Sequence, residues 1–106
     1  MNKEQIIQCG DELFEAMCNR TTLRPFTERY DDITIEDAYN ISLRMIERRV
    51  EAGEKIIGKK IGVTSKAVQS MLNVHQPDFG FLTDKMAFSQ GQEMPISEQL
   101  IQPKAE

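Results

Sequence analysis

The residues best suited to chemistry lie in the second half of the chain, where glycines surround a lysine and an aspartate. Lys60 stands between Gly58 and Gly62, and Asp78 stands two residues before Gly80. Because alternate residues of a strand share a face, Lys60 would share its face with two residues that lack side chains. Glycine weakens a strand, so the pattern indicates that another molecule approaches the backbone closely. A lysine and an aspartate across a small cavity could transfer protons, provided that burial or each other's charge tunes them.

A structural interpretation explains the same residues. The glycines could mark bulges or close packing, and Lys60 and Asp78 could form an ordinary ion pair; periodicity alone favours this interpretation. On the opposite face, Phe79 and Phe81 are expected to face the core. Lys59 shares that face with aliphatic residues, and we expect it to extend its amine to solvent at an edge.

The charge of the chain is unevenly distributed. Residues 1–55 hold 8 basic and 12 acidic groups, whereas residues 56–106 hold 5 of each. Residues 56–75 contain three lysines and no carboxylate. Such a stretch would attract a small anion, although a solvated basic face would have the same composition. The net charge of −4 argues against a general nucleic-acid binder, which needs a basic surface.

The N-terminal segment and the cysteines indicate the compartment. The segment carries charges throughout, so it predicts neither a signal peptide nor a membrane span. Cys9 and Cys18 are nine positions apart, which places them on opposite faces of a helix. Neither has metal-ligand spacing around it. We therefore expect reduced thiols in a cytoplasmic protein.

Two long helices are predicted in the first half of the chain. Asn2 can cap a helix that runs to about Arg20, and Thr34 can cap a second helix with Asp37 at the capping-box position. The charged residues within 44–51 are expected on the wet side of the second helix. An apolar stripe marks the buried side of the first helix. The stripe consists of Ile6, Gly10, Leu13, Phe14 and Met17.

After Gly53, which can end the second helix in the left-handed conformation, the pattern changes to that of short strands. Strands are predicted over residues 56–63, 79–82 and 86–89. A short helix that Ser65 caps and Asn73 can end separates the first two strands. The residues of this helix expected to face inward are Val68, Met71 and Leu72.

Together these elements predict an α+β fold in two regions. A helical region covers residues 1–55, and the start of a β-rich catalytic region covers residues 56–106. The chain ends at Glu106, in the sequence PKAE, without a cap or turn that would close a domain. We therefore expect the front part of a longer protein, truncated at its C-terminus.

The sequence GKKIGVTSKAVQSMLNVHQPDFGFLTDKM and its flanking segments resemble the 2-hydroxypenta-2,4-dienoate hydratases of the fumarylacetoacetate hydrolase-like superfamily. The resemblance covers essentially the whole chain and less than half of a family member. It implies an incomplete mixed β-roll after the helices. It also implies hydration of 2-hydroxypenta-2,4-dienoate to 4-hydroxy-2-oxopentanoate in the meta-cleavage degradation of aromatic compounds, with little or no activity from this chain alone.

The resemblance also implies roles for individual residues. The family's proton-transfer lysine and aspartate fall on Lys60 and Asp78, and which of them is acid or base stays open. Gly58, Gly62 and Gly80 would line the substrate pocket. The family holds Mg²⁺ or Mn²⁺ with three acidic side chains.

Glu106 matches the first of these three metal ligands, and the other two would lie beyond this chain. Further implied properties of the full-length protein are homo-oligomerisation and association with 4-oxalocrotonate decarboxylase.

Three alternatives stay open. The sister enzyme, 4-oxalocrotonate decarboxylase, shares the fold, but Lys59 and residues 75–80 favour the hydratase. The chain could instead be a non-catalytic docking subunit or remnant, which would bind its partner in the presence of a chelator. A module that binds small anions without metal is the third.

Overall fold

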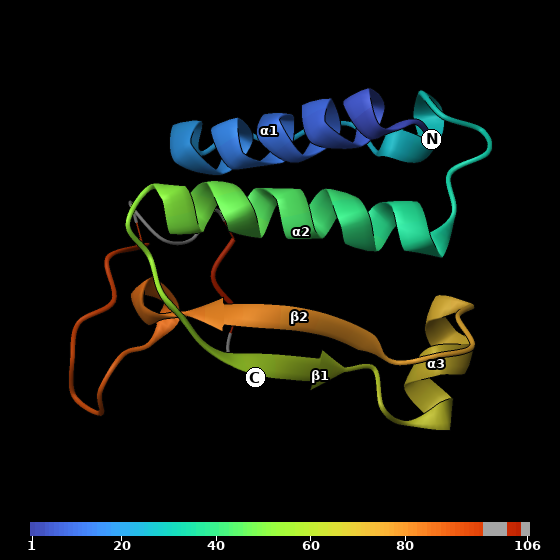
Figure 1. The fold of residues 1–106 in the computed structure, drawn as a ribbon. Coiled ribbons are helices and arrows are strands. Elements are labelled where there is room, and N and C mark those ends of the chain that lie inside the picture. Colours follow the sequence, from blue (N-terminus) through green and yellow to red (C-terminus); the bar gives the residue numbers. More distant parts are fainter. Residues whose placement is uncertain (97–101, 105–106) are drawn as a thin grey trace. The chain divides into compact units, whose positions relative to one another are not determined.

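Within residues 1–96 and 102–104, which the computed structural model describes, three α-helices and one two-stranded antiparallel sheet are present (Figure 1). The predicted α+β class is therefore confirmed. In chain order the elements are α1 (Lys3–Asn19), a 3₁₀ turn (Phe26–Glu28), α2 (Ile35–Glu51), β1 (Ile56–Gly62), α3 (Lys66–Leu72), β2 (Asp78–Thr83) and a second 3₁₀ turn (Asp84–Met86).

The chain divides into two compact units. We call Met1–Gly53 with Gln90–Glu106 the helical unit, and Glu54–Ser89 the hairpin unit. None of the helices in the described ranges combines the length and apolar character that a membrane span requires.

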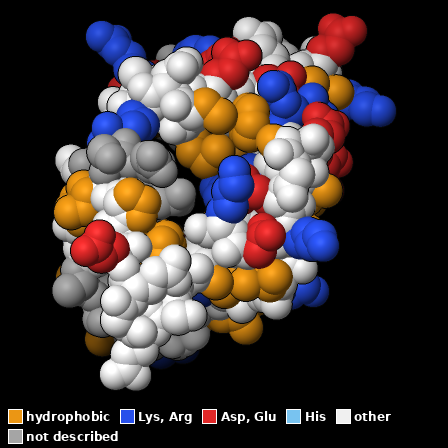
Figure 2. Space-filling model, turned by 90° about the vertical axis from the view of Figure 1, so that its left-hand side faces the viewer, with side chains coloured by type: hydrophobic (Ala, Val, Ile, Leu, Met, Phe, Trp, Pro, Cys, Tyr) orange, Lys and Arg blue, Asp and Glu red, His pale blue; other side chains and the backbone are white. Residues whose placement is uncertain are grey.

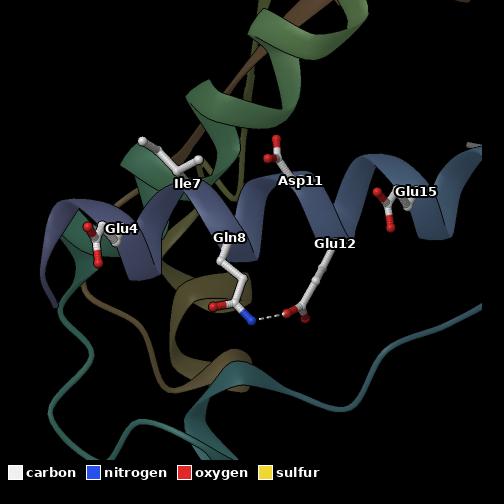
Figure 3. A pocket seen from close by; sticks show the side chains of 6 residues that line it. All are labelled: Glu4, Ile7, Gln8, Asp11, Glu12 and Glu15. Atoms are coloured by element: carbon white, nitrogen blue, oxygen red, sulfur yellow. Dashed lines mark hydrogen bonds between the residues drawn. The ribbon is translucent and has the colours of Figure 1, made fainter.

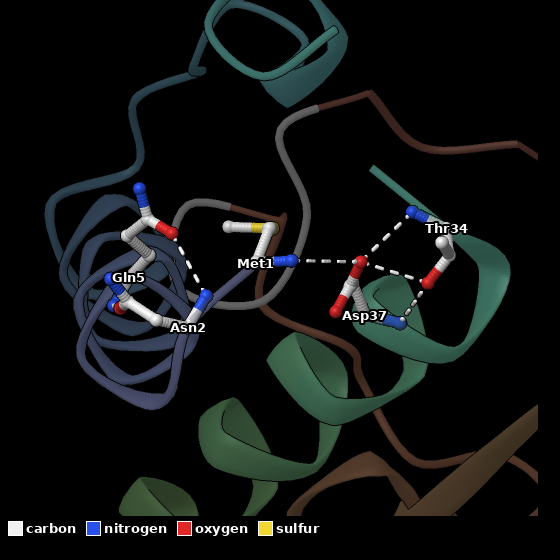
Figure 4. A network of polar contacts seen from close by, with 5 residues as sticks. All are labelled: Met1, Asn2, Gln5, Thr34 and Asp37. Atoms are coloured by element: carbon white, nitrogen blue, oxygen red, sulfur yellow. Dashed lines mark hydrogen bonds and ion pairs between the residues drawn. The ribbon is translucent and has the colours of Figure 1, made fainter. Parts of the chain in front are cut away.

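Both long helices begin at the predicted cap residues, Asn2 and Thr34, and both caps are reciprocal, which was predicted for Thr34 alone (Figure 4). The Asn2 side chain accepts from the Gln5 N–H at 2.9 Å, and the Gln5 side chain accepts from the Asn2 N–H at 2.9 Å. Asp37 Oδ2 accepts from the N–H and hydroxyl of Thr34 at 3.0 and 2.8 Å, which holds the pKa of Asp37 below its usual value. The amine of Met1 lies 3.4 Å from the same carboxylate.

Helices α1 and α2 lie side by side and run in the same direction (Figure 1). Cys9, Ala16 and Ile41 are buried, so they form the centre of this unit. Gly10 is also buried, and a Cβ at this position would overlap Cβ and Cγ of Arg44 and lie 3.0 Å from the Ile41 carbonyl oxygen. The absence of a side chain at Gly10 therefore lets the two helices approach closely.

Glu47 and Glu51 of α2 are exposed, as predicted, but its arginines contradict the expected wet side. Arg44 and Arg48 lie 2.9 and 2.8 Å from Asp11 of α1, and their hydrogen bonds lower the pKa of Asp11. The guanidinium of Arg48 also lies 4.7 Å from the centre of the Phe14 ring, and Arg49 is buried. A guanidinium on a long stem can cover apolar surface and pair with a carboxylate at once, so these residues belong to the contact between the helices.

The connection between the parallel helices returns along α1. Arg29 pairs with Glu12 at 2.7 Å, and its guanidinium stacks 5.0 Å from the centre of the Phe26 ring. Both cysteines are free; Cys9 is buried and Cys18 is exposed, in agreement with their predicted separation on the helix.

The third predicted strand, at 86–89, is wrong. Met86 ends the second 3₁₀ turn, and residues 87–89 have no regular structure. The N–H groups of Lys55 and Lys85 both donate to the Asp84 carboxylate, at 2.9 and 3.1 Å, and lower its pKa. These bonds bend the chain into a turn directly after β2.

Candidate active site on the hairpin

The β1–β2 hairpin brings together the lysine and aspartate singled out by the sequence. In the antiparallel register Lys60 is opposite Gly80, and Gly62 is opposite Asp78. Opposite residues share a face, as do alternate residues of one strand. Lys60 and Asp78 are therefore diagonal neighbours on one face, at a typical Cα separation of about 7–8 Å.

We call this face the glycine face. It consists of Gly58, Lys60, Gly62, Asp78, Gly80 and Leu82.

The space above the glycine face is open. Among the described residues, a Cβ built at Gly62 or Gly80 would meet no heavy atom within 4 Å, and one at Gly58 would meet only Leu82 Cδ1, at 3.9 Å. Lys60 and Asp78 are both exposed. The hairpin thus positions two groups capable of proton transfer beside unfilled volume, but within the described residues it does not enclose them.

The opposite face of the hairpin carries Lys59, Ile61, Phe79 and Phe81, and we call it the aromatic face. Phe79 is 56% exposed and Ile61 58% exposed, so the prediction that the phenylalanines face the core is wrong for Phe79. A two-stranded sheet has too little surface to bury both of its faces. The Lys59 amine lies 5.7 Å from the centre of the Phe81 ring, a cation–π contact on this face.

The connection between the strands also differs from its prediction. Ser65 caps α3 and Asn73 ends it in the left-handed conformation, as expected. Met71, however, is 75% exposed and Leu72 is exposed as well, whereas Gln69 is buried. The Gln69 amide donates to the carbonyl of Val63 at 3.0 Å, so a polar contact decides which side of α3 faces inward.

Hydrophobic side chains reach the molecular surface at several places in the space-filling view (Figure 2). Monomeric proteins expose single apolar residues routinely. Exposed hydrophobic residues are nevertheless concentrated on the aromatic face and on α3. The hairpin unit therefore contains little hydrophobic core of its own.

Sequence reasoning missed the residues that hold the base of the hairpin. Thr83 Oγ1 donates to Glu54 Oε1 at 2.5 Å, and both side chains are buried. The Asp84 N–H donates to the Lys55 carbonyl at 2.9 Å. Glu54 lies just before β1 and Thr83 is the last residue of β2, so the only signal in the sequence was their position at the ends of two predicted strands.

A shallow hollow along α1 is lined by carboxylates but is a poor candidate site (Figure 3). Asp11 and Glu12 are already paired with arginines, and the Gln8 amide donates to Glu12 at 3.1 Å. The residues that line the hollow are Glu4, Ile7, Gln8, Asp11, Glu12 and Glu15.

The predicted metal ligand, Glu106, lies outside the described residues. Within the described part of the chain, no group of three or more His, Cys, Asp or Glu residues is arranged to hold a metal ion.

Comparison with known proteins supports the resemblance drawn from the sequence. No model of a known protein family matches the chain. It is 65% identical over 106 residues to a 2-hydroxypent-2,4-dienoate hydratase of Pseudomonas putida, covering all of this chain and 48% of the relative. It is 53% identical over 108 residues to a 2-hydroxyhexa-2,4-dienoate hydratase of Comamonas testosteroni, covering all of this chain and 41% of the relative. The chain therefore spans under half the length of these curated relatives.

A solved structure shows the same fold. The chain matches a 4-oxalocrotonate decarboxylase from Pseudomonas putida G7, complexed with magnesium and adipate, with a TM-score of 0.75 and 30% identity. The match covers 79% of this chain and 32% of the decarboxylase chain. The same enzyme complexed with calcium and acetate matches equally well. This likeness supports the fumarylacetoacetate hydrolase-like fold. The mixed β-roll stays a prediction, because the described residues form a single two-stranded sheet.

Proposed function

We propose that this chain, which resembles the 2-hydroxypentadienoate hydratases along its whole length, supplies the proton-transfer residues of such an enzyme. The observation that carries the proposal is the 65% identity to a hydratase, together with the register that puts Lys60 and Asp78 on one open face. Because the chain spans under half of its relatives, the activity is proposed for a protein of their length.

The proposed reaction converts 2-hydroxypenta-2,4-dienoate to 4-hydroxy-2-oxopentanoate. The dienol first gains a proton at C5 and loses the proton of its 2-hydroxyl, which gives a conjugated 2-oxo-3-enoate. Water then adds its hydroxyl at C4 and a proton at C3. In their charged forms lysine can only donate a proton and aspartate can only accept one, so Lys60 is the proposed donor to C5 and Asp78 the proposed acceptor.

The glycines of the same face have a proposed role in binding. With no Cβ at Gly58, Gly62 or Gly80, a flat dienoate could approach the strands more closely than other residues would allow. The net positive charge of residues 56–75 would attract the anionic substrate towards this part of the chain.

A divalent cation is part of the proposal, with Glu106 as one ligand. The described residues do not themselves supply a metal site. Support comes from the decarboxylase structures, which are complexed with magnesium or calcium. Hard oxygen ligands suit Mg²⁺ or Mn²⁺, and either ion would stabilise negative charge at the 2-oxygen of the substrate.

The remaining proposals concern the longer protein. They are a mixed β-roll that continues from the hairpin, a division into regions 1–55 and 56–106, homo-oligomerisation, association with 4-oxalocrotonate decarboxylase, and a cytoplasmic location within aromatic degradation.

The test is to assay a protein of the relatives' length that contains this chain, beside the 106 residues alone. We expect the longer protein to hydrate 2-hydroxypenta-2,4-dienoate without change in carbon count. A chelator should abolish this activity, and Mg²⁺ or Mn²⁺ should restore it. The 106 residues alone should show little or no turnover.

Two other outcomes would replace the proposal. Release of CO₂ from 4-oxalocrotonate without hydration would assign the decarboxylase reaction instead. Tight association with a decarboxylase that survives chelation, without turnover of either substrate, would indicate a docking subunit.

A further inference from the structure

One residue of the hairpin unit has a strained backbone. Among the described residues, three besides glycine have a positive φ: Arg20, Val63 and Asn73, each at 54–55°. Arg20 and Asn73 end helices, where the left-handed conformation is common. Val63 instead follows the last residue of β1, and its β-branched side chain makes this conformation costly. Such strain persists only where surrounding contacts enforce it, and it occurs preferentially at functional sites.

A buried side chain holds Val63 in this conformation. The Gln69 amide of α3 donates to the Val63 carbonyl at 3.0 Å, and Gln69 is only 6% exposed. The direction of a carbonyl changes with the dihedral angles of its own residue, so this hydrogen bond favours the left-handed conformation over an extended one. Because a buried amide without a partner would be costly, the bond also resists opening.

The strained residue lies at the end of the hairpin that carries Asp78. Gly62 and Asp78 form the last pair of the register, and Val63 follows Gly62 directly. An extended Val63 would be opposite Pro77, which has no N–H for a ladder hydrogen bond. The ends of an element open more readily than its centre. The position of Asp78 therefore depends on how the chain turns from β1 towards α3 (Figure 1).

We propose that Gln69 is a positioning residue whose bond to Val63 fixes this turn and thereby the place of Asp78. The fixed turn keeps Asp78 opposite Gly62 and diagonal to Lys60 on the glycine face. The catalytic meaning of this placement rests on the proposed hydratase function, whereas the placement itself does not.

The proposal predicts a local effect. Without the donor, Val63 can relax to the extended conformation, and the chain then leaves β1 in a different direction. The pair of Gly62 with Asp78 should open. The pair of Lys60 with Gly80 lies two residues further into the ladder and should stay closed.

Both pairs can be observed by NMR on the 106-residue chain, through nuclear Overhauser effects between backbone protons of the two strands. Gln69→Met keeps a side chain of similar size but removes the donor. We expect this variant to lose the Gly62–Asp78 signals and to retain the Lys60–Gly80 signals. Retention of both sets would overturn the proposal. Loss of both would also overturn it, since Gln69 would then support the hairpin as a whole.

A second substitution tests whether strain at Val63 is the reason. Glycine adopts a positive φ without steric cost, so Val63→Gly should make the turn independent of the Gln69 bond. Gln69→Met combined with Val63→Gly should therefore regain the Gly62–Asp78 signals. Their continued absence would overturn the proposal, because the strained conformation would not be what Gln69 maintains.

Turnover tests the catalytic meaning separately. In a protein of the relatives' length, Gln69→Met should lower kcat by about 100-fold through misplacement of Asp78, with little change in KM. Adding Val63→Gly should restore most of the rate, which would not follow from a general loss of structure. An opened Gly62–Asp78 pair with unchanged turnover would refute the role of Asp78 in catalysis while leaving its positioning by Gln69 established.

Discussion

The helical unit and the hairpin unit differ in where they keep their apolar side chains. In the helical unit, Ile41 is only 2% exposed and Arg48 covers the Phe14 ring. In the hairpin unit, Ile61 and Phe79 are each more than half exposed. The helical unit thus has buried side chains between its two long helices. The hairpin unit carries the residues suited to chemistry but buries little apolar surface of its own. Stability and candidate chemistry are located in different parts of this chain, so substitutions in the two units should have separable effects.

The largest expected effect separates the two lysines of the hairpin. In a protein of the relatives' length, Lys60→Ala and Asp78→Asn should each reduce turnover by about 100-fold or more, as expected for a lost acid or base. The matched control is Lys59→Ala, which removes an amine from the aromatic face and should leave the rate near that of the unchanged protein. Steady-state kinetics on the three variants would measure this, with circular dichroism to verify folding.

Equal losses in Lys59→Ala and Lys60→Ala would contradict the assignment of the glycine face as the catalytic face. The glycines of β1 and β2 would then be explained by bulges or close packing alone.

A smaller effect compares one glycine from each unit. Gly10→Ala should destabilise the helical unit by about 1–3 kcal/mol, because the new methyl group overlaps Arg44 where α1 and α2 meet. Gly62→Ala adds the same group where no heavy atom of the described residues lies within 4 Å, so it should leave the free energy of unfolding nearly unchanged. Urea unfolding followed by circular dichroism would compare them. A Gly10→Ala variant as stable as the original would show that the helices can separate at little cost.

The smallest effect concerns acid. Hydrogen bonds from Arg48 and Arg44 hold the pKa of Asp11 below its usual value. A lowered pKa in the folded state adds stability above the usual value, and this stability is lost as pH falls through the lowered pKa. We therefore expect the urea midpoint of the helical signal to decrease as the pH is lowered from about 5 through the lowered pKa of Asp11. Asp11→Asn should make this decrease of the urea midpoint with pH shallower. An unchanged slope would show that the ion pairs of Asp11 do not contribute to the acid sensitivity.

The sequence predicted well those features that depend on neighbours along the chain. The caps at Asn2 and Thr34 and the left-handed ends at Gly53 and Asn73 were all correctly placed, because a cap needs only residues within one helical turn. The alternation that separates Lys60 from Lys59 is equally local, since the pleat of a strand fixes it.

The sequence predicted poorly which faces are covered. Phe79 and Met71 were expected inside because they are apolar, but a side chain is buried only if another element lies over it. Arg44 and Arg48 were expected in solvent, yet Asp11 and Phe14 on a neighbouring helix bind them. Such contacts join residues more than 30 positions apart, so periodicity within one segment does not contain them.

What the sequence alone determined is therefore the three helices and the first two strands, though not the third predicted strand, and the pair of candidate residues, Lys60 and Asp78. It also gave a family resemblance that the comparisons support. What only the tertiary structure decided is the pairing of the two strands. Lys60 is opposite Gly80 in a register that contains a bulge at Ile57, and a buried hydrogen bond between Glu54 and Thr83 closes the base of the hairpin. A strand's faces follow from its own residues, but its register follows from contacts at both of its ends.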